Sequence, residues 1–231
     1  MTDVSPVTIL DRPLYSVTEA ARLLRIPSAS LRRWLEGWDV KGTHYEPVIR
    51  PVATGLDAVT WAEFIEAGFL REYRLAKRVS LQRMRPFLER ARTELKVPYP
   101  LAHFKPFVSN RELVYELQEE SSLDPALFLV RREGDQMIWA EPVQEFLERV
   151  DFEPESDLVA RLHPLGRDRP VVIDPAVTFG IPQIRGLRAE LIAESVAAGG
   201  YSEAEESWGV SAVEIDAALE WQQALTVRQA A

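Results

Sequence analysis

The sequence predicts a mainly helical α+β protein with small β hairpins between its helices. Three observations lead to this prediction: two short capped helical stretches between residues 15 and 38, short apolar runs around turn residues between 107 and 139, and three helical stretches after residue 189. The 231 residues are enough for two or three small domains. Residues 1–14 contain Pro6 and Pro13, so we expect a flexible lead-in there.

Residues 15–38 have the pattern of a helix-turn-helix. Ser16 and Glu19 have the spacing of a capping box, which starts a helix. Pro27 ends that helix, and Ser28 is placed to cap a second one. Apolar side chains fall on one face of each helix: Val17, Ala20, Ala21 and Leu24 in the first, and Leu31, Trp34 and Leu35 in the second.

The second helix leaves polar and cationic side chains on its outer face. Ser30, Arg32 and Arg33 can donate hydrogen bonds to phosphates and base edges, as the recognition helix of such a motif does. Ser28, at the start of the same helix, is a further candidate DNA contact. Two short capped helices also occur in proteins that never bind DNA, and the spacing alone leaves that alternative open.

The charge of the chain is unevenly distributed. The net charge is −9. Residues 1–98 hold 16 Lys and Arg against 12 Asp and Glu, whereas residues 99–231 hold 11 against 24. The basic part coincides with the helix-turn-helix, which favours nucleic-acid binding there, although scattered surface charge is the alternative.

The segment Ser30-Leu31-Arg32-Arg33-Trp34, after the SVTEAARLL helix, resembles the winged helix-turn-helix of the MerR and excisionase type. Val48–Pro51 stands where that fold places its wing, Trp61–Arg71 resembles the following helix, and Arg78–Arg85 resembles the next one. The resemblance implies a winged helix domain over residues 15–98 that contacts promoter DNA through the recognition helix and through Arg50 of the wing.

Residues 99–157 are expected to form a hairpin-rich linker or dimerisation region. One hairpin is predicted from Phe107–Ser109 and Glu112–Tyr115, and another from Leu127–Val130 and Met137–Trp139. Pro142 suits the first turn of a helix that continues to Val150. Residues 151–157 are acidic, and we expect them to be exposed.

Residues 158–225 are expected to form a trihelical domain after two short strands, Leu158–Leu165 and Val171–Asp174. The first helix ends at Gly199-Gly200, and two capping boxes, Ser202 with Glu205 and Ser211 with Glu214, open the others. The last two of these helices have the shape of a helix-turn-helix, but no Lys or Arg lies between Arg188 and Arg228. The acidic side chains there would repel DNA phosphates, so we expect this domain to bind protein or to dimerise.

The segment from Ile173 through Gly180-x-Pro-x-Ile-Arg-Gly-x-Arg resembles a bacterial domain associated with VapB-like antitoxins, which are encoded beside VapC-like PIN-domain ribonucleases. The resemblance implies a type II antitoxin that inhibits a PIN-domain RNase toxin and represses its own operon. Candidate toxin contacts are Arg185, Arg188, Trp221 and, in the tail over residues 226–231, Arg228. The alternatives are a disordered tail, and arginines that pair with local carboxylates such as Asp174.

Enzyme motifs are missing from the sequence. There is no cysteine, the three histidines lack metal-ligand spacing, and no P-loop, dinucleotide fingerprint or nucleophile elbow is present. We therefore expect no enzyme activity, cofactor or metal. The open alternatives are a regulator that binds a small molecule between Trp139, Phe146 and Phe152, and a carboxylate-dependent hydrolase.

The sequence shows no signal peptide and no apolar run as long as a membrane span, so we expect a cytoplasmic protein without membrane contact. A homodimer is expected because helix-turn-helix proteins generally bind two half-sites.

Overall fold

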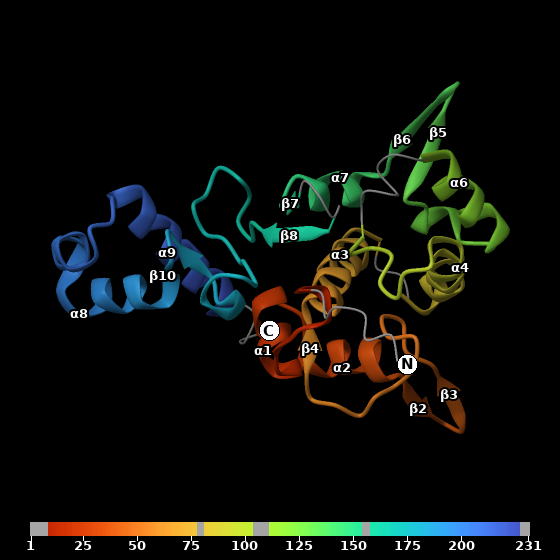
Figure 1. Ribbon diagram of the computed structural model, residues 1–231, viewed down its shortest axis with the longest axis horizontal. Helices are drawn as coiled ribbons and strands as arrows, with labels where there is room; N and C mark the ends of the chain where they lie inside the picture. Colours follow the sequence, from red (N-terminus) through yellow and green to blue (C-terminus); the bar gives the residue numbers. More distant parts are fainter. Residues whose placement is uncertain (1–8, 78–80, 104–110, 154–157, 227–231) are drawn as a thin grey trace, which may run out of the picture. The chain divides into compact units, whose positions relative to one another are not determined.

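The computed structural model describes residues 9–77, 81–103, 111–153 and 158–226 (Figure 1). The chain divides into two compact units. Unit 1 comprises residues 1–147 and 153–159, and unit 2 comprises residues 148–152 and 160–231. Helices joined by two-stranded sheets make up the described parts of both units, which confirms the prediction of a mixed α+β protein with small hairpins.

Unit 1 begins with the 3-10 helix η1 (Ile9–Asp11) and strand β1 (Pro13–Tyr15), followed by helix α1 (Val17–Leu24). The Ser16 side chain accepts a hydrogen bond of 3.1 Å from the backbone N–H of Glu19, as the capping box predicts. Arg25 then adopts a left-handed conformation with φ 54°, and its N–H donates to the last turn of α1. The predicted start and end of this helix are confirmed.

Helix α2 (Ser28–Glu36) starts differently from the prediction. Pro27 is the N-cap residue, and its carbonyl accepts hydrogen bonds from the backbone N–H groups of Ser30 and Leu31. No side chain caps this helix, and Ser28 is its first helical residue. The prediction that Ser28 caps α2 is therefore wrong, because Pro27 takes that place with an extended ψ of 129°.

A β hairpin follows α2 directly. Strands β2 (Trp38–Val40) and β3 (Thr43–Tyr45) pair antiparallel around Lys41 and Gly42, which both have positive φ. Such a turn matches the twist of the two strands. Trp38 and Tyr45 stack with their ring centroids 4.8 Å apart.

The segment expected to form the wing, Val48–Pro51, contains no strand. Val48 and Ile49 are buried, and their N–H groups both donate to the carbonyl of Trp34 in α2. The prediction of a wing at Val48–Pro51 is therefore wrong. The β hairpin of this region lies before that segment, at Trp38–Tyr45.

The long helix α3 (Trp61–Lys77) provides the core of unit 1, and the helix predicted from Trp61 is confirmed. Strand β4 (Val59–Thr60) precedes it and pairs with β1. Buried side chains of α3 include Trp61, Ala62, Phe64, Ile65, Ala67, Phe69, Leu70 and Tyr73. The Trp61 indole donates a hydrogen bond of 2.7 Å to the carbonyl of Val159, which belongs to the same unit.

After α3, residues 78–80 of the helix predicted over Arg78–Arg85 lie outside the described residues. Leu81–Met84 form the 3-10 helix η2, and α4 (Arg85–Leu95) starts at the residue where the predicted helix ends. Lys96, with φ 55°, terminates α4.

Helix α6 (Arg111–Glu120) replaces a predicted strand. Glu112–Tyr115 were expected in a hairpin, but Val114 and Leu117 are buried at helical spacing, so that prediction is wrong. Its partner, Phe107–Ser109, lies outside the described residues. The second predicted hairpin is present, with β5 (Val130–Glu133) paired to β6 (Gln136–Trp139). Its first strand begins later than predicted, because Leu127 belongs to the 3-10 helix η3 (Pro125–Leu127).

Helix α7 (Glu141–Leu147) ends before Val150, where its predicted range stops, because Val150–Phe152 form strand β7. Strand β7 pairs with β8 (Val159–Leu162), so the expected strand at Leu158–Leu165 is present in shortened form. Asp151 was expected to be exposed but is partly buried, with ion pairs to His163 at 2.8 Å and to Arg167 at 2.6 Å.

Unit 2 continues with irregular chain held by single bridges, Leu162 to Ile173 and Val172 to Gln183. The short elements η4 (Thr178–Gly180), β9 (Gln183–Ile184) and β10 (Leu187–Arg188) lead into the helices.

Helix α8 (Ala189–Trp208) is interrupted at Gly200, which has φ 83° and ψ −174°, and α9 (Ala212–Thr226) follows. The interruption coincides with the predicted helix stop. The Glu214 carboxylate accepts hydrogen bonds from the N–H and the hydroxyl of Ser211 at 2.8 and 2.9 Å, close to the capping box expected there. Ser202 lies within the helical run.

None of the helices in the described ranges is both long enough and apolar enough to cross a membrane.

Candidate nucleic-acid interface

Helix α2 has one buried and one exposed face. Leu31, Trp34 and Leu35 are buried in unit 1. On the other face, Arg32 and Arg33 are exposed, as are Ser28 and Ala29 at the start of the helix, while Ser30 is half-buried. The predicted DNA contacts of the recognition helix are thus brought together on one surface, with two guanidinium groups at its centre.

Arg32 has a specific partner on this surface. Its Nη2 donates to Oδ1 of Asp57 at 2.9 Å, and the two side chains are 52% and 57% exposed. Asp57 belongs to the loop over residues 51–57, here called loop 51–57, whose residues are all exposed. Arg33 makes no ion pair within the described part of the chain.

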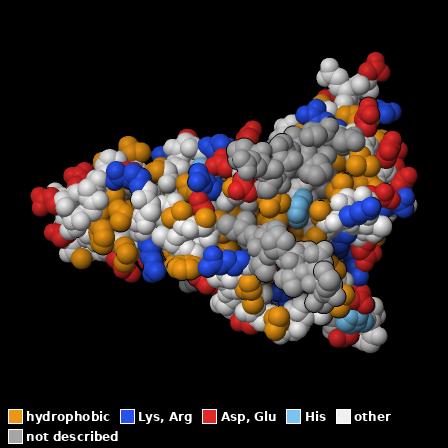
Figure 2. All heavy atoms as spheres, in the orientation of Figure 1, with side chains coloured by type: hydrophobic (Ala, Val, Ile, Leu, Met, Phe, Trp, Pro, Cys, Tyr) orange, Lys and Arg blue, Asp and Glu red, His pale blue; other side chains and the backbone are white. Residues whose placement is uncertain are grey.

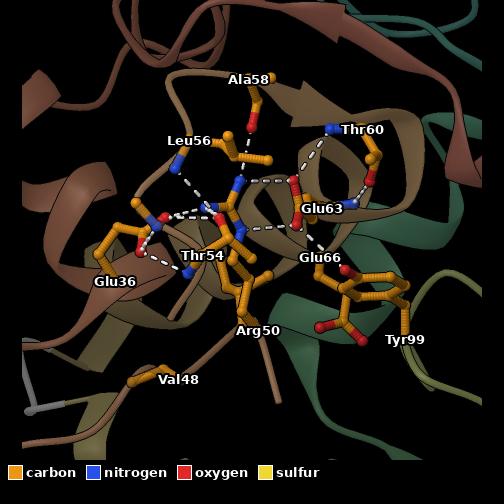
Figure 3. A network of polar contacts seen from close by, with 12 residues as sticks. Glu36, Val48, Arg50, Thr54, Leu56, Ala58, Thr60, Glu63, Glu66 and Tyr99 are labelled. Carbon is orange, nitrogen blue, oxygen red and sulfur yellow. Dashed lines mark hydrogen bonds and ion pairs between the residues drawn. The ribbon is translucent and has the colours of Figure 1, made fainter. Parts of the chain in front are cut away.

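Arg50 lies inside unit 1, with only 3% of its side chain exposed. Its Nε and Nη2 donate to the two carboxylate oxygens of Glu63 at 2.7 and 3.2 Å, and Nη1 forms an ion pair with Glu36 (Figure 3). Nη1 also donates to the hydroxyl of Thr54 at 2.6 Å, and Nη2 donates to the carbonyl of Ala58 at 2.5 Å. The prediction that Arg50 contacts DNA is wrong, because every donor nitrogen of this guanidinium binds a group inside the protein.

Glu36 connects this network to the recognition helix, of which it is the last residue. Its Oε2 accepts hydrogen bonds of 2.8 Å from the backbone N–H groups of both Thr54 and Gly55 (Figure 3). Loop 51–57 is therefore fixed to the C-terminal end of α2 through its own backbone. This arrangement could not be predicted from the sequence, because the two acidic partners of Arg50 lie 14 and 13 residues away, on different helices.

Glu63 organises the start of α3 on the other side of Arg50. Its Oε2 accepts from the N–H of Thr60 at 2.9 Å, and its own N–H donates to the Thr60 hydroxyl at 3.3 Å, so the pair forms a capping box. The Tyr99 hydroxyl donates to Oε1 of Glu63 at 3.0 Å. Burial and the neighbouring Glu63 carboxylate raise the pKa of Tyr99, which keeps this hydroxyl protonated as a donor.

Glu66 is a second buried acid, one helical turn after Glu63. Its Oε1 accepts the N–H of Leu101 at 2.9 Å, while Oε2 has no hydrogen-bond partner and lies 3.9 Å from Nη2 of Arg92. Burial raises the pKa of Glu66 to about 8. A carboxyl with this pKa is mainly protonated at neutral pH.

The β2–β3 hairpin carries polar side chains near α2. Lys41, Thr43 and His44 are exposed. A hydrogen bond of 3.0 Å to Asp39 raises the pKa of His44, and Glu46 lies 3.7 Å away on its other side. The hairpin therefore carries the cation Lys41, and His44 gains positive charge at mildly acidic pH, next to the carboxylates of Asp39 and Glu46.

The candidate toxin contacts in unit 2 have different surroundings. Arg185 is exposed, but its guanidinium binds Glu214 at 2.7 Å and the carbonyl of Gly209 at 2.7 Å. Arg188 is exposed at the start of α8. Trp221 is only 2% exposed, so the prediction that it offers a contact surface is wrong. Arg228 lies outside the described residues.

Sequence reasoning missed the exposed aromatic residues of unit 2. Tyr201 and Trp208 are 43% and 37% exposed, and the Tyr201 hydroxyl donates to Asp216 at 2.8 Å. Figure 2 shows acidic side chains along the outer edge of α8 and α9, with hydrophobic side chains beside them. For Trp221, the spacing in the sequence does indicate burial, because this residue shares a helical face with Ile215 and Ala218, and that face points inward.

Two of the aromatic residues considered as walls of a small-molecule pocket belong to the core of unit 1. Trp139 and Phe146 are buried, and Phe146 packs edge-to-face on Phe69 with centroids 5.4 Å apart. Among the described residues, no group of three or more His, Asp or Glu side chains is arranged to hold a metal ion.

Comparison with known proteins agrees with the geometry of α2. Residues 13–88 match the model of a family described as "Putative DNA-binding HTH domain". This match supports the prediction of a DNA-binding helix-turn-helix at the N-terminal end of the chain.

Two proteins of Mycobacterium tuberculosis are similar over most of the chain. The uncharacterized protein Rv2308 is 27% identical over 223 residues, which cover 95% of this chain and 94% of that protein. A protein named "Putative antitoxin VapB45" is 29% identical over 191 residues, which cover 76% of this chain and 78% of the relative. Together with the family match, they support a DNA-binding, antitoxin-like protein.

A solved structure shares the fold. The crystal structure of Rv2018 from Mycobacterium tuberculosis has a TM-score of 0.73 and 26% sequence identity, covering 92% of this chain and all of that chain. The arrangement of elements described above is therefore also found in an experimental structure.

Proposed function

We propose that this protein is the antitoxin of a type II toxin-antitoxin system that represses its own operon. It binds promoter DNA through α2 and inhibits a VapC-like PIN-domain ribonuclease through unit 2. One observation carries the DNA-binding part: the outward face of α2 presents Arg32 and Arg33 within a segment that matches a DNA-binding family. The similarity to a relative named as an antitoxin supports the second part.

In the proposed complex, α2 lies in the major groove. Ser28 and Ser30 at its first turns face base edges, and Arg33 contacts phosphate. The β2–β3 hairpin takes the role of the wing of a MerR-like domain, with Lys41 at its tip near the sugar-phosphate backbone. A homodimer places two such helices on two half-sites.

Unit 2 is the proposed toxin-binding part. Helices α8 and α9 carry carboxylates and no Lys or Arg between Arg188 and Arg228, so this unit suits a basic protein surface better than DNA. Arg188 is exposed and is the first candidate for a cation inserted into the carboxylate cluster of the toxin, with Arg185 second because Glu214 already pairs with it. Arg228 remains a proposal from the sequence.

The DNA-binding part is tested with fluorescence anisotropy on a labelled duplex from upstream of the protein's own gene. We expect Arg33→Ala to weaken binding and to lower the slope of log affinity against log salt by about one. The matched control is Arg131→Ala, an exposed arginine on the β5–β6 hairpin, which should bind as the wild type does. Equal affinities of the wild type and the Arg33 variant would contradict this use of α2.

The antitoxin part is tested by co-expression with the product of the adjacent reading frame. We expect the wild-type chain to co-purify with that product and to relieve its growth inhibition, and Arg188→Glu to lose both effects. The control is Arg132→Glu in unit 1. If the wild type neither binds the product nor relieves its effect, the protein is not the antitoxin of that product.

A further inference from the structure

The ion pair between Arg32 and Asp57 joins the exposed face of the recognition helix to a loop 25 residues further along the chain. It uses one N–H of the guanidinium, the one on Nη2 that points to Asp57 Oδ1 at 2.9 Å. An exposed ion pair of this kind usually adds little to stability. Its position, on the surface proposed to face DNA, gives it another use.

Asp57 does not depend on Arg32 for its position. Loop 51–57 is held by the hydrogen bonds from the N–H groups of Thr54 and Gly55 to Glu36, and Ala58 accepts a hydrogen bond from buried Arg50 (Figure 3). The carboxylate therefore stands beside α2 before any ligand binds. Because this carboxylate already holds the Arg32 side chain in the free protein, the arginine loses less rotamer freedom when the protein binds DNA.

The remaining donors of Arg32 suit one base. A guanidinium has five N–H donors in a planar fork, and the two-point contact of arginine with guanine uses two parallel N–H groups toward O6 and N7. The Asp57 carboxylate, hydrogen-bonded to Nη2, limits the rotation of the Arg32 guanidinium. It also occupies a donor that could otherwise reach phosphate. We propose that Asp57 is a positioning residue that makes Arg32 a reader of guanine in the major groove.

This proposal rests on the proposed DNA binding and assigns different tasks to two neighbouring arginines. Asp57 adds negative charge near the duplex, which lowers affinity for DNA of any sequence. Its effect on Arg32 raises the difference between matching and non-matching sites, which is what specificity requires. Arg33, with no carboxylate partner in the described residues, supplies affinity for phosphate at every sequence.

The test uses the full-length chain and a pool of duplexes with a randomised 20-base-pair segment, a length of about two turns that accommodates two half-sites. Wild type, Asp57→Ala and Arg33→Ala are each selected on this pool, and the bound duplexes are sequenced. Glu133→Ala is the matched control, an exposed acid on β5 outside the surface proposed to face DNA. Thermal unfolding of each variant shows whether loop 51–57 keeps its anchorage.

We expect the wild type to enrich a site with a required guanine, and Asp57→Ala to lose about tenfold or more of the discrimination at that base pair. Asp57→Ala should at the same time bind non-matching duplex more tightly. Replacing that guanine by 7-deazaguanine, which lacks N7, should weaken the wild type by a similar factor and leave Asp57→Ala and Arg32→Ala unchanged.

Three results would overturn the proposal. Unchanged base preference in Asp57→Ala would mean that the ion pair has no part in reading sequence. Parallel loss of affinity for all duplexes would assign Asp57 to the structure of the loop alone. If the wild type enriches no sequence at all, the proposed DNA binding fails and the inference fails with it, whereas the first two results leave DNA binding intact.

Discussion

Replacing Arg50 by methionine is expected to destabilise unit 1 without removing any DNA contact. The substitution leaves the carboxylates of Glu36 and Glu63 without their cation in a site where the side chains are 15% and 4% exposed. Breaking a buried ion pair by removing one partner costs about 3–5 kcal/mol. A domain of this size loses about 2–4 °C in melting temperature per kcal/mol, so we expect a decrease of about 6–20 °C.

The assay is thermal unfolding followed by circular dichroism at 222 nm, combined with hydrogen exchange to assign the loss to unit 1. The matched control is Arg33→Met, which removes an equal charge from an exposed position and should change stability by less than about 0.5 kcal/mol. Arg33→Met should lose DNA affinity while Arg50→Met, measured well below its melting temperature, should keep it.

A second variant separates lost charge from lost packing. Arg50→Met combined with Glu63→Gln and Glu36→Gln removes the charges of the network and keeps side-chain oxygens as acceptors for Thr60, Tyr99, Thr54 and Gly55. We expect it to recover part of the stability, because no uncompensated buried charge remains. Two results would refute the reasoning: Arg50→Met with the melting temperature of the wild type, or a triple variant that is less stable than Arg50→Met alone.

Three further predictions concern other sites. Gly37→Ala should destabilise unit 1 by about 1–3 kcal/mol and weaken DNA binding, because Gly37 has φ +74° and an added Cβ would clash with the Tyr45 carbonyl oxygen. Urea unfolding and fluorescence anisotropy measure the two effects, and wild-type values would contradict the prediction. Glu66 has its pKa raised by burial from 4.5 to about 8, so the folded state holds a proton that the unfolded state releases, and stability should fall as pH rises from about 4.5 to 8. Glu66→Gln should show a smaller decline in urea unfolding over this range, and an unchanged decline would exclude Glu66 as its cause. Trp221→Ala should cost about 3–5 kcal/mol because the indole is buried, whereas Trp208→Ala at an exposed position should melt close to the wild type; similar melting curves for the two variants would be inconsistent with this burial.

The helix-turn-helix could be predicted from the sequence because its determinants are local. The Ser16 cap, the apolar spacing of α1 and the break at Pro27 each act over fewer than five residues. The exposed face of α2 follows from the same spacing. The start of α2 differs from the prediction because serine is a favoured N-cap residue, whereas Pro27 occupies that position in the structure.

The network around Arg50 could not be predicted because it depends on tertiary contacts. Arg50 is one of sixteen basic residues in the first 98, and the sequence does not show which of them becomes buried. Its burial requires that α2 end at Glu36 and that α3 begin near Glu63, so that two carboxylates meet one guanidinium. The hairpin Trp38–Tyr45, by contrast, had a local sign in Lys41-Gly42 between alternating residues.

The hydrogen bond from the Trp61 indole to the Val159 carbonyl joins two parts of unit 1 that the ribosome synthesises at different times. The two residues are 98 positions apart, and Val159 must leave the ribosome before the core around α3 is complete. At about 5–20 residues per second, roughly 5–20 s separate the synthesis of these residues. Throughout that interval the Trp61 indole lacks the acceptor that it has in the complete unit 1.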